Sequence, residues 1–291
     1  MRPVEEHEVL METPQIDRVF PWCSKLQLRY TADQFASGST WIYHNLTDGR
    51  DFGSDLADLP FVHPSQLNRM QRIWYNMVLQ ALQSHTQLLL IVNGTAGTGK
   101  TFTIAAISRN LPKEYLVRSA FTAKAAYLIR GDTLHKTFQI PVEKGPAKFG
   151  PLNGSKLAAL QETFTNVQLV IIDEYSMVSL PMFGKMDARL REAKGKDIFF
   201  GGVLMVLVGD PDQLPPVASP SLYSQTTVPY ANEGRAAYLA FQSVIKLTEV
   251  RRQVVAEGDT DQQTFLETLN SLPEGNCSVE QWRFLQTRNP G

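Results

Sequence analysis

A glycine-rich octapeptide that follows an apolar run constrains the fold of this chain more than any other feature. The run is Leu88–Val92, and the octapeptide Gly94–Thr101 reads G-T-A-G-T-G-K-T, which fits the pattern G-x-x-x-x-G-K-[ST]. Such a loop lies between a buried strand and a helix, because its backbone N–H groups and the helix N-terminus act on the same anion. The pattern predicts a nucleoside triphosphate site in an α/β fold.

The positions of this loop have separate expected roles. We expect Lys100 to reach the β- and γ-phosphates and the Thr101 hydroxyl to ligate Mg²⁺. The backbone around the phosphates is expected to come from Gly94, Thr95, Ala96, Gly97, Thr98 and Gly99.

Strand and helix patterns alternate after the loop, which predicts a mainly parallel sheet with helices on both faces. A helix with an Asn68–Gln71 capping box precedes the loop. The predicted strands are Leu88–Asn93, Tyr115–Ser119, Leu169–Ile172, Val203–Val208 and Val244–Leu247. The later predicted helices are Lys100–Asn110, Thr122–Ile129, Lys156–Phe164, Met182–Lys194, Asp261–Leu272 and Val279–Gln286, and a mobile loop is expected over Pro141–Gly154.

Polar side chains follow two of the predicted strands. Asp173 and Glu174 end one apolar strand, where Asp173 can hold Mg²⁺ through water and Glu174 can polarise the attacking water. Gln213 follows another strand, at the sheet edge where ligands of open α/β sheets bind. Its amide either contacts the γ-phosphate or the attacking water, or it is a plain loop residue.

Composition and charge narrow the class of protein. Hydrophobic residues make up 43% and charged residues 20%, which is typical of a globular chain, and the longest apolar runs are too short to cross a bilayer. Cys23 and Cys277 lie far apart, which argues against a local zinc site and favours free thiols in a reducing, intracellular compartment. Residues 100–160 carry ten Lys and Arg against three acids, a net charge of +7, which indicates either a polyanion groove or solvated helix faces.

Several blocks of the sequence resemble the motifs of superfamily-one helicases. Their residues are most similar to those of the PIF-type DNA helicases, including the versions carried by Helitron transposons. Motifs I, II and III correspond to Gly94–Thr101, Ile171–Val178 and Val208–Val217. The Q motif, the motif Ia region and motif IV correspond to Leu67–Gln71, Ser119–Ala126 with Gly131–His135, and Leu247–Gln253. The chain departs from the family in having Phe121-Thr122-Ala123 where Pro-Thr-Gly is usual, and Met70 where an acid is usual.

The resemblance implies further site residues. Gln71 would read adenine, unless it only completes the helix cap, and Arg252 would reach the γ-phosphate, unless it is a surface charge. Contacts to single-stranded DNA would come from Thr122, Lys124, Thr133 and His135, with a helix N-cap as the alternative for Thr122 and a core histidine for His135.

The resemblance also implies a RecA-like core. We expect an N-terminal extension over residues 1–62, a RecA-like ATPase domain over 63–246, and the beginning of a second, truncated helicase domain over 247–291. The implied function is an ATP-dependent DNA helicase that moves five-prime to three-prime with ATP and Mg²⁺, acts on single strands and duplex junctions, and has no membrane partner. The implied processes are DNA repair, recombination and telomere maintenance, with the nucleus as the expected compartment and the mitochondrion left open. The alternatives are an ATP- and DNA-binding module inactive as a helicase, and a small-molecule kinase.

Overall fold

The computed structural model of the chain describes residues 59–60, 62–141, 149–225, 228, 230–250, 260–272 and 275–287. Of the predicted N-terminal extension, only Leu59, Pro60 and Val62 are among them. The predicted γ-phosphate residue Arg252 and half of the predicted mobile loop, residues 142–148, lie outside the described residues.

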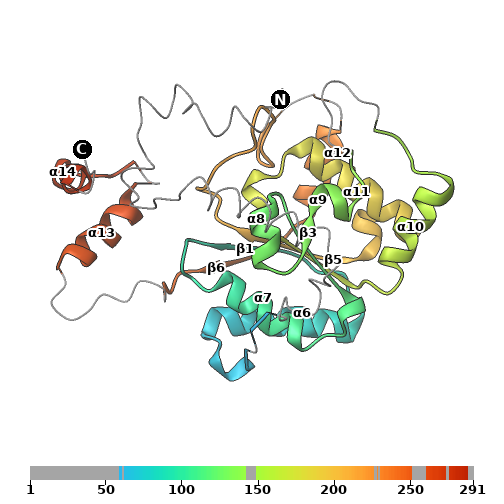
Figure 1. The fold of residues 1–291 in the computed structure, drawn as a ribbon, viewed down its shortest axis with the longest axis horizontal. Coiled ribbons are helices and arrows are strands. Elements are labelled where there is room, and N and C mark those ends of the chain that lie inside the picture. The colour runs from blue at the N-terminus through green and yellow to red at the C-terminus, as the bar shows by residue number, and fades with distance from the viewer. Residues whose placement is uncertain are drawn as a thin grey trace, which may run out of the picture. The chain divides into compact units, whose positions relative to one another are not determined.

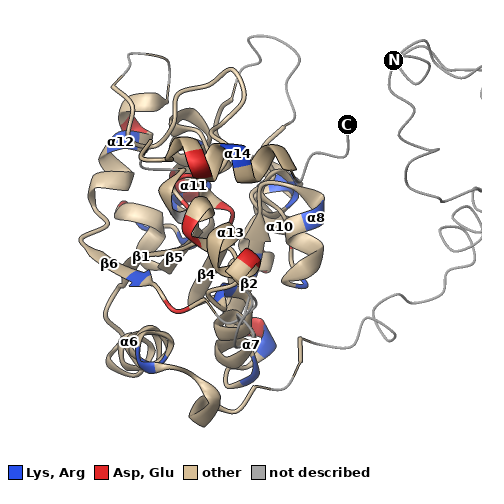
Figure 2. Cartoon of the chain, turned by 90° about the vertical axis from the view of Figure 1, so that its left-hand side faces the viewer, with Lys and Arg blue, Asp and Glu red and all other residues tan. Residues whose placement is uncertain are grey.

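The core is a parallel sheet of six strands in the order β3-β2-β4-β5-β1-β6. In chain order the strands are β1 (Leu89–Gly94), β2 (Leu116–Ala120), β3 (Asp132–Thr133), β4 (Leu169–Asp173), β5 (Leu204–Gly209) and β6 (Ser243–Leu247). The central strands β4 and β5 are buried at every position, because helices cover both faces. Figure 2 shows β6, β1, β5, β4 and β2 side by side. The predicted α/β fold class is confirmed.

Two groups of helices sandwich this sheet (Figure 1). The helices α6 (Arg69–Ser84), α7 (Lys100–Arg109) and α8 (Ala123–Leu128) share a core with one face of the strands. The opposite face packs against α9 (Leu134–Thr137), α10 (Gly154–Phe164), α11 (Leu180–Lys194) and α12 (Ala231–Leu239). Successive strand residues alternate between the two cores, as Leu90 and Ile91 do, because side chains of a strand point to opposite faces.

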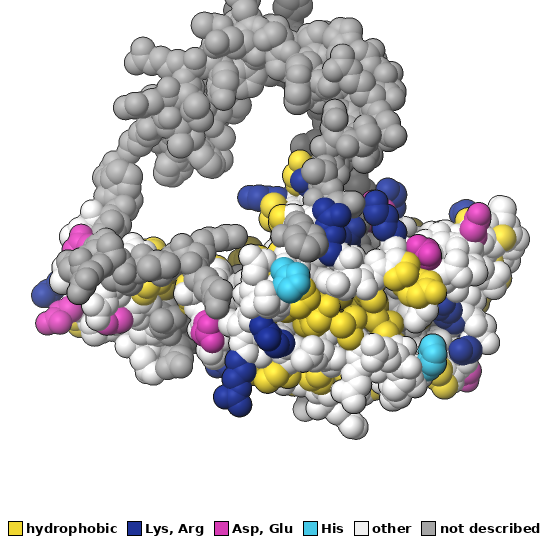
Figure 3. Space-filling view, turned by 90° about the horizontal axis from the view of Figure 1, so that it is seen from below, with side chains coloured by type: hydrophobic (Ala, Val, Ile, Leu, Met, Phe, Trp, Pro, Cys, Tyr) yellow, Lys and Arg dark blue, Asp and Glu magenta, His cyan; other side chains and the backbone are white. Residues whose placement is uncertain are grey.

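The predicted capping box of α6 is present. Asn68 Oδ1 accepts the backbone N–H of Gln71 at 2.9 Å, and Gln71 Oε1 accepts the N–H of Asn68 at 3.0 Å. Trp74 and Val78 of this helix are fully buried, whereas Ile73 keeps 39% exposure. Figure 3 shows hydrophobic side chains gathered on the underside of the molecule, the side on which Figure 1 places α6 and α7.

Helices α11 and α12 approach closely at two glycines. A Cβ on Gly234 would lie 1.9 Å from the backbone oxygen of Leu180, and one on Gly184 would lie 2.4 Å from that of Tyr230. Neither helix could hold this position with a larger residue at the crossing. The glycine in α12 also weakened its helical signal in the sequence, which explains why this helix was not predicted.

Two further helices, α13 (Thr260–Ser271) and α14 (Val279–Thr287), follow β6 and match the helices predicted there. Their assignment to a second domain stays a prediction. Among the residues that the structure describes, no helix is both long and apolar enough to span a membrane.

Candidate functional site

The glycine-rich loop connects β1 to α7 as a tight turn. Gly97 and Gly99 have φ of 85° and 82°, a region that favours glycine. Thr98 is fully buried, and its hydroxyl donates to the backbone oxygen of Thr95 at 2.8 Å. A Cβ on Gly94 would lie 2.5 Å from that hydroxyl oxygen. The loop is therefore closed on itself, with its backbone arranged around the start of α7.

Lys100 and Thr101 begin the helix. Lys100 Nζ donates to the backbone oxygens of Gly94 at 2.7 Å and Thr95 at 3.2 Å, so the ammonium group lies over the loop. Thr101 is exposed at the same helix start. A phosphate above this loop would meet the ammonium, the helix N-terminus and a hydroxyl together.

The two acids lie at the end of β4. Asp173 is 6% exposed, and its Oδ1 accepts the backbone N–H of Glu174 at 3.0 Å. Burial raises the pKa of the Asp173 carboxyl to about 6; the charge of Glu174 also raises it, while that hydrogen bond and Lys100 lower it. Glu174 has φ of 54°, so the chain turns sharply after the strand. The two carboxyl groups thus have different surroundings, as two roles would require.

A hydrogen bond that the sequence did not indicate joins the segment after Asp173 and Glu174 to the strand before the glycine-rich loop. The Tyr175 hydroxyl donates to Asn93 Oδ1 at 2.8 Å, across 82 positions of the chain. Burial raises the pKa of the Tyr175 phenol, and its ring lies where a Cβ on Gly209 would come within 2.9 Å. The ends of β1, β4 and β5 are therefore connected through one tyrosine. Only the adjacency of these strands, which is a tertiary feature, reveals this contact.

Beyond β5 the chain turns at Asp210, which is 7% exposed. Its backbone oxygen accepts the N–H of Gln213 at 3.2 Å, and its Oδ1 accepts the N–H of Asp212 at 3.2 Å. Gln213 is exposed after this turn. A pocket of about 400 Å³ joins this turn to the glycine-rich loop and to the end of β6, with Asn93, Asp210 and Lys246 in its wall.

Gln71 lies beneath the loop and is only 1% exposed. Its Oε1 accepts from Asn68, and its Nε2 donates to the backbone oxygen of Thr98 at 3.0 Å. A Cβ on Gly99 would lie 2.3 Å from that Nε2 atom. The amide therefore supports the phosphate loop, and reading adenine would require it to exchange Thr98 for the base. Adenine recognition by Gln71 stays a prediction.

The Q-motif region also meets the segment that follows β6. Asn68 Nδ2 donates to Glu249 Oε2 at 3.1 Å, across 181 positions of the chain. Glu249 belongs to the block predicted to carry the γ-phosphate arginine, whose Arg252 is not described.

The four predicted DNA residues lie around the ends of β2 and β3, where Ala120 pairs with Thr133. The Thr122 hydroxyl accepts the backbone N–H of Ala125 at 3.2 Å and so caps α8, which confirms the N-cap reading. Lys124 is exposed, and His135 is half-buried against Phe121 with ring centroids 6.2 Å apart. Burial lowers the pKa of His135, and Lys185 lowers it further. Ala120 also pairs with Asp173, so these residues share an edge of the sheet with the acids.

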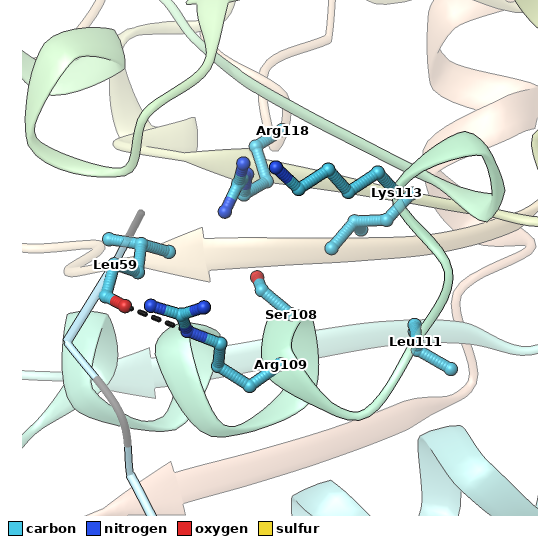
Figure 4. Close-up of a pocket in the computed structure, with 7 residues that line it drawn as sticks. Leu59, Ser108, Arg109, Leu111, Lys113 and Arg118 are labelled. Atoms are coloured by element: carbon cyan, nitrogen blue, oxygen red, sulfur yellow. Dashed lines mark hydrogen bonds between the residues drawn. The ribbon is translucent and has the colours of Figure 1, made fainter. Parts of the chain in front are cut away.

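The basic segment does not form a single surface. Arg109, Lys113 and Arg118 line a separate pocket of about 170 Å³, formed by the end of α7 and the start of β2 (Figure 4). Lys113 and Arg118 extend toward one another, and Arg109 Nε donates to the Leu59 oxygen at 3.0 Å. This pocket lies toward the strand starts, whereas the glycine-rich loop follows a strand end.

The donor atoms at the loop fit Mg²⁺, a hard cation that binds carboxylate, hydroxyl and phosphate oxygens. The Thr101 hydroxyl would supply one direct oxygen ligand, and the Asp173 carboxylate would hold the ion through water, as the sequence predicts. No cluster of three or more His, Cys, Asp or Glu suited to a metal is found in the described ranges. The remaining ligands would be phosphate oxygens and water, as is usual for Mg²⁺.

Comparison with known proteins gives the same family by two routes. The family model of the PIF1-like helicases matches residues 66–283. The ATP-dependent DNA helicase PIF1 of Xenopus laevis is 35% identical over 197 residues, which cover 67% of this chain and 29% of the relative. The human ATP-dependent DNA helicase PIF1 is 31% identical over 198 residues, covering 68% of this chain and 29% of the relative. The chain thus spans less than a third of the length of these relatives.

Among solved structures, the Pif1 helicase from Candida albicans superimposes with a TM-score of 0.56 at 28% identity. The match covers 75% of this chain and 46% of that one.

Proposed function

We propose that this chain, which belongs to the PIF1-like helicase family, provides the ATP-binding core of a DNA helicase. The helicase would couple ATP hydrolysis to movement along single-stranded DNA. One observation carries the proposal: the glycine-rich loop, the acids Asp173 and Glu174, and the predicted DNA residues lie at strand ends of one sheet. ATP hydrolysis at the loop and the acids would therefore be transmitted through the sheet to the residues that contact DNA.

In the proposed reaction the loop backbone and Lys100 bind the triphosphate and neutralise charge that develops during transfer. Thr101 and Asp173 would hold Mg²⁺, which when bound screens the phosphate oxygens. Glu174 orients the attacking water and takes its proton, and Gln213 and Arg252 complete the surroundings of the γ-phosphate. Adenine recognition belongs to Gln71 in this proposal.

Single-stranded DNA would lie over Thr122, Lys124, Thr133 and His135. The direction of movement, five-prime to three-prime, and the nuclear or mitochondrial location are part of the same proposal. The second candidate is a module that binds ATP and DNA without unwinding.

ATP hydrolysis measured with and without single-stranded DNA, followed by strand displacement, separates these functions. A helicase shows hydrolysis stimulated by DNA together with displacement, a module binds without displacement, and a kinase transfers phosphate without DNA. We expect Lys100→Ala to abolish hydrolysis, and full activity of this variant would refute the site. Glu174→Gln should retain ATP binding while losing turnover, because it removes only the base.

A further inference from the structure

The helix α8 carries an exposed stripe of which the proposed function uses only Lys124. Lys124, Tyr127 and Leu128 lie at positions i, i+3 and i+4 and therefore share one side of the helix. Tyr127 is 58% and Leu128 57% exposed. On the opposite side, Ala125 and Ala126 are buried in the core. The helix thus presents an aromatic, an aliphatic and a cationic side chain to solvent.

A second cation supports the aromatic ring. The guanidinium of Arg130 lies 4.7 Å from the centroid of the Tyr127 ring, within the range of a cation–π contact. The Nη1 atom of Arg130 is buried and makes no hydrogen bond within the described part of the chain. Tyr127 as a whole keeps 58% exposure, so the guanidinium does not bury this residue.

The stripe belongs to the helix that carries two predicted DNA contacts, Thr122 and Lys124. Helix α8 carries one basic residue, Lys124, and no acid. The nearest acid along the chain, Asp132, forms an ion pair with Lys136 at 2.7 Å. The local charge is therefore positive, which suits a polyanion.

We propose that Tyr127 is a stacking platform for one base of single-stranded nucleic acid, with Lys124 contacting a neighbouring phosphate and Arg130 holding the ring from behind. The inference rests on the proposed function and adds a base contact to it. An exposed aromatic ring among cations is how single strands are bound without sequence preference, because every base has a π-face. A duplex could not use this ring in the same way, since its bases are already stacked.

The test compares two oligonucleotides that share a backbone. One is an oligothymidylate of about 12 nucleotides, and the other has the same length but carries abasic sites. Fluorescence anisotropy with the full chain measures both dissociation constants. We expect Tyr127→Ala to raise the constant for oligothymidylate about tenfold and to leave the constant for the abasic strand unchanged. Tyr127→Trp should restore tight binding.

Two further variants give matched controls. Lys124→Ala should weaken binding of both oligonucleotides and lower the salt slope by about one, as expected for a phosphate contact. Ile198→Ala removes a side chain that is 51% exposed and precedes β5, on the side of the sheet where the strands start, and should change neither constant.

The outcomes are distinct. Oligothymidylate binding that is unchanged in Tyr127→Ala overturns the stacking role and leaves the proposed function standing, as does an equal loss on both oligonucleotides. A wild-type chain that binds neither oligonucleotide overturns DNA binding and the stacking role together. Selective loss of the base-dependent part of the affinity supports the platform, provided that the urea midpoint of the variant equals that of the wild type.

Discussion

The position of Gln71 beneath the phosphate loop makes a quantitative prediction about Gln71→Ala. The side chain is 1% exposed and satisfies two backbone groups, the N–H of Asn68 and the oxygen of Thr98. Truncation leaves both groups without these partners. Each unpaired buried group costs about 1–3 kcal/mol, so we expect the free energy of unfolding to fall by about 2–6 kcal/mol without nucleotide.

Urea denaturation of the nucleotide-free chain measures this loss. The matched control is Gln66→Ala, because Gln66 Oε1 makes the same kind of bond, accepting the backbone N–H of His63 at 2.9 Å, but Gln66 is exposed. Its loss should stay within about 0.5 kcal/mol. Equal losses in the two variants would refute the claim that burial makes the Gln71 contacts important.

The same variant separates the two readings of this residue. If Gln71 only supports the loop, Gln71→Ala weakens ATP and GTP binding by the same factor. If it reads adenine, the preference for ATP over GTP falls. Gln71→Glu keeps the oxygen that accepts the Asn68 N–H, but it replaces Nε2, which lies 3.0 Å from the Thr98 oxygen in the wild type, with a second oxygen. This variant should therefore disturb the loop while it preserves the helix cap.

Two predictions concern stability elsewhere. Gly234→Ala places a Cβ 1.9 Å from the Leu180 oxygen and should cost about 1–3 kcal/mol in urea denaturation, whereas a Cβ on Gly150 meets nothing within 4 Å, so that Gly150→Ala serves as the unaffected control. Burial raises the pKa of the Asp173 carboxyl from 3.8 to about 6, so in Mg²⁺-free buffer the protonated form favours the folded state. The contribution of this group to the free energy of unfolding is therefore full below about pH 3.8 and is lost as the pH rises through 6. Asp173→Asn should therefore raise the melting temperature at pH 7 and not at pH 4, and an equal shift at both would contradict the burial effect.

The elements that the sequence predicted are those with a local signature. The strand before the loop and the helix after it follow from an apolar run and a phosphate-binding pattern, and the capping box at Asn68 follows from residue spacing. The missed strand β3 has only two residues, Asp132 and Thr133, too few for any period to show. It exists because β2 already offers it a hydrogen-bonding edge.

Contacts between distant residues explain what the sequence could not predict at the site. The bond between Tyr175 and Asn93 needs β1, β4 and β5 to lie together, and the bond from Gln71 to Thr98 spans 27 positions. Each side chain has an adequate local explanation, as a core aromatic or a helix cap. Only the tertiary fold brings these residues together at the candidate nucleotide site.

The distribution of positive charge shows how the sheet decides which cations can serve DNA. Arg109 and Lys113 come from the same basic segment as Lys124, yet they line a pocket toward the strand starts. Lys124 follows a strand end, on the side where the acids lie. In a parallel sheet the strand starts and the strand ends are separated by the length of the strands. A DNA strand coupled to ATP hydrolysis would therefore contact Lys124 without contacting Arg109 or Lys113. The net charge of +7 over residues 100–160 therefore overstates the charge of any single groove, and the strand-end side of the sheet is the better guide to where the proposed DNA strand would lie.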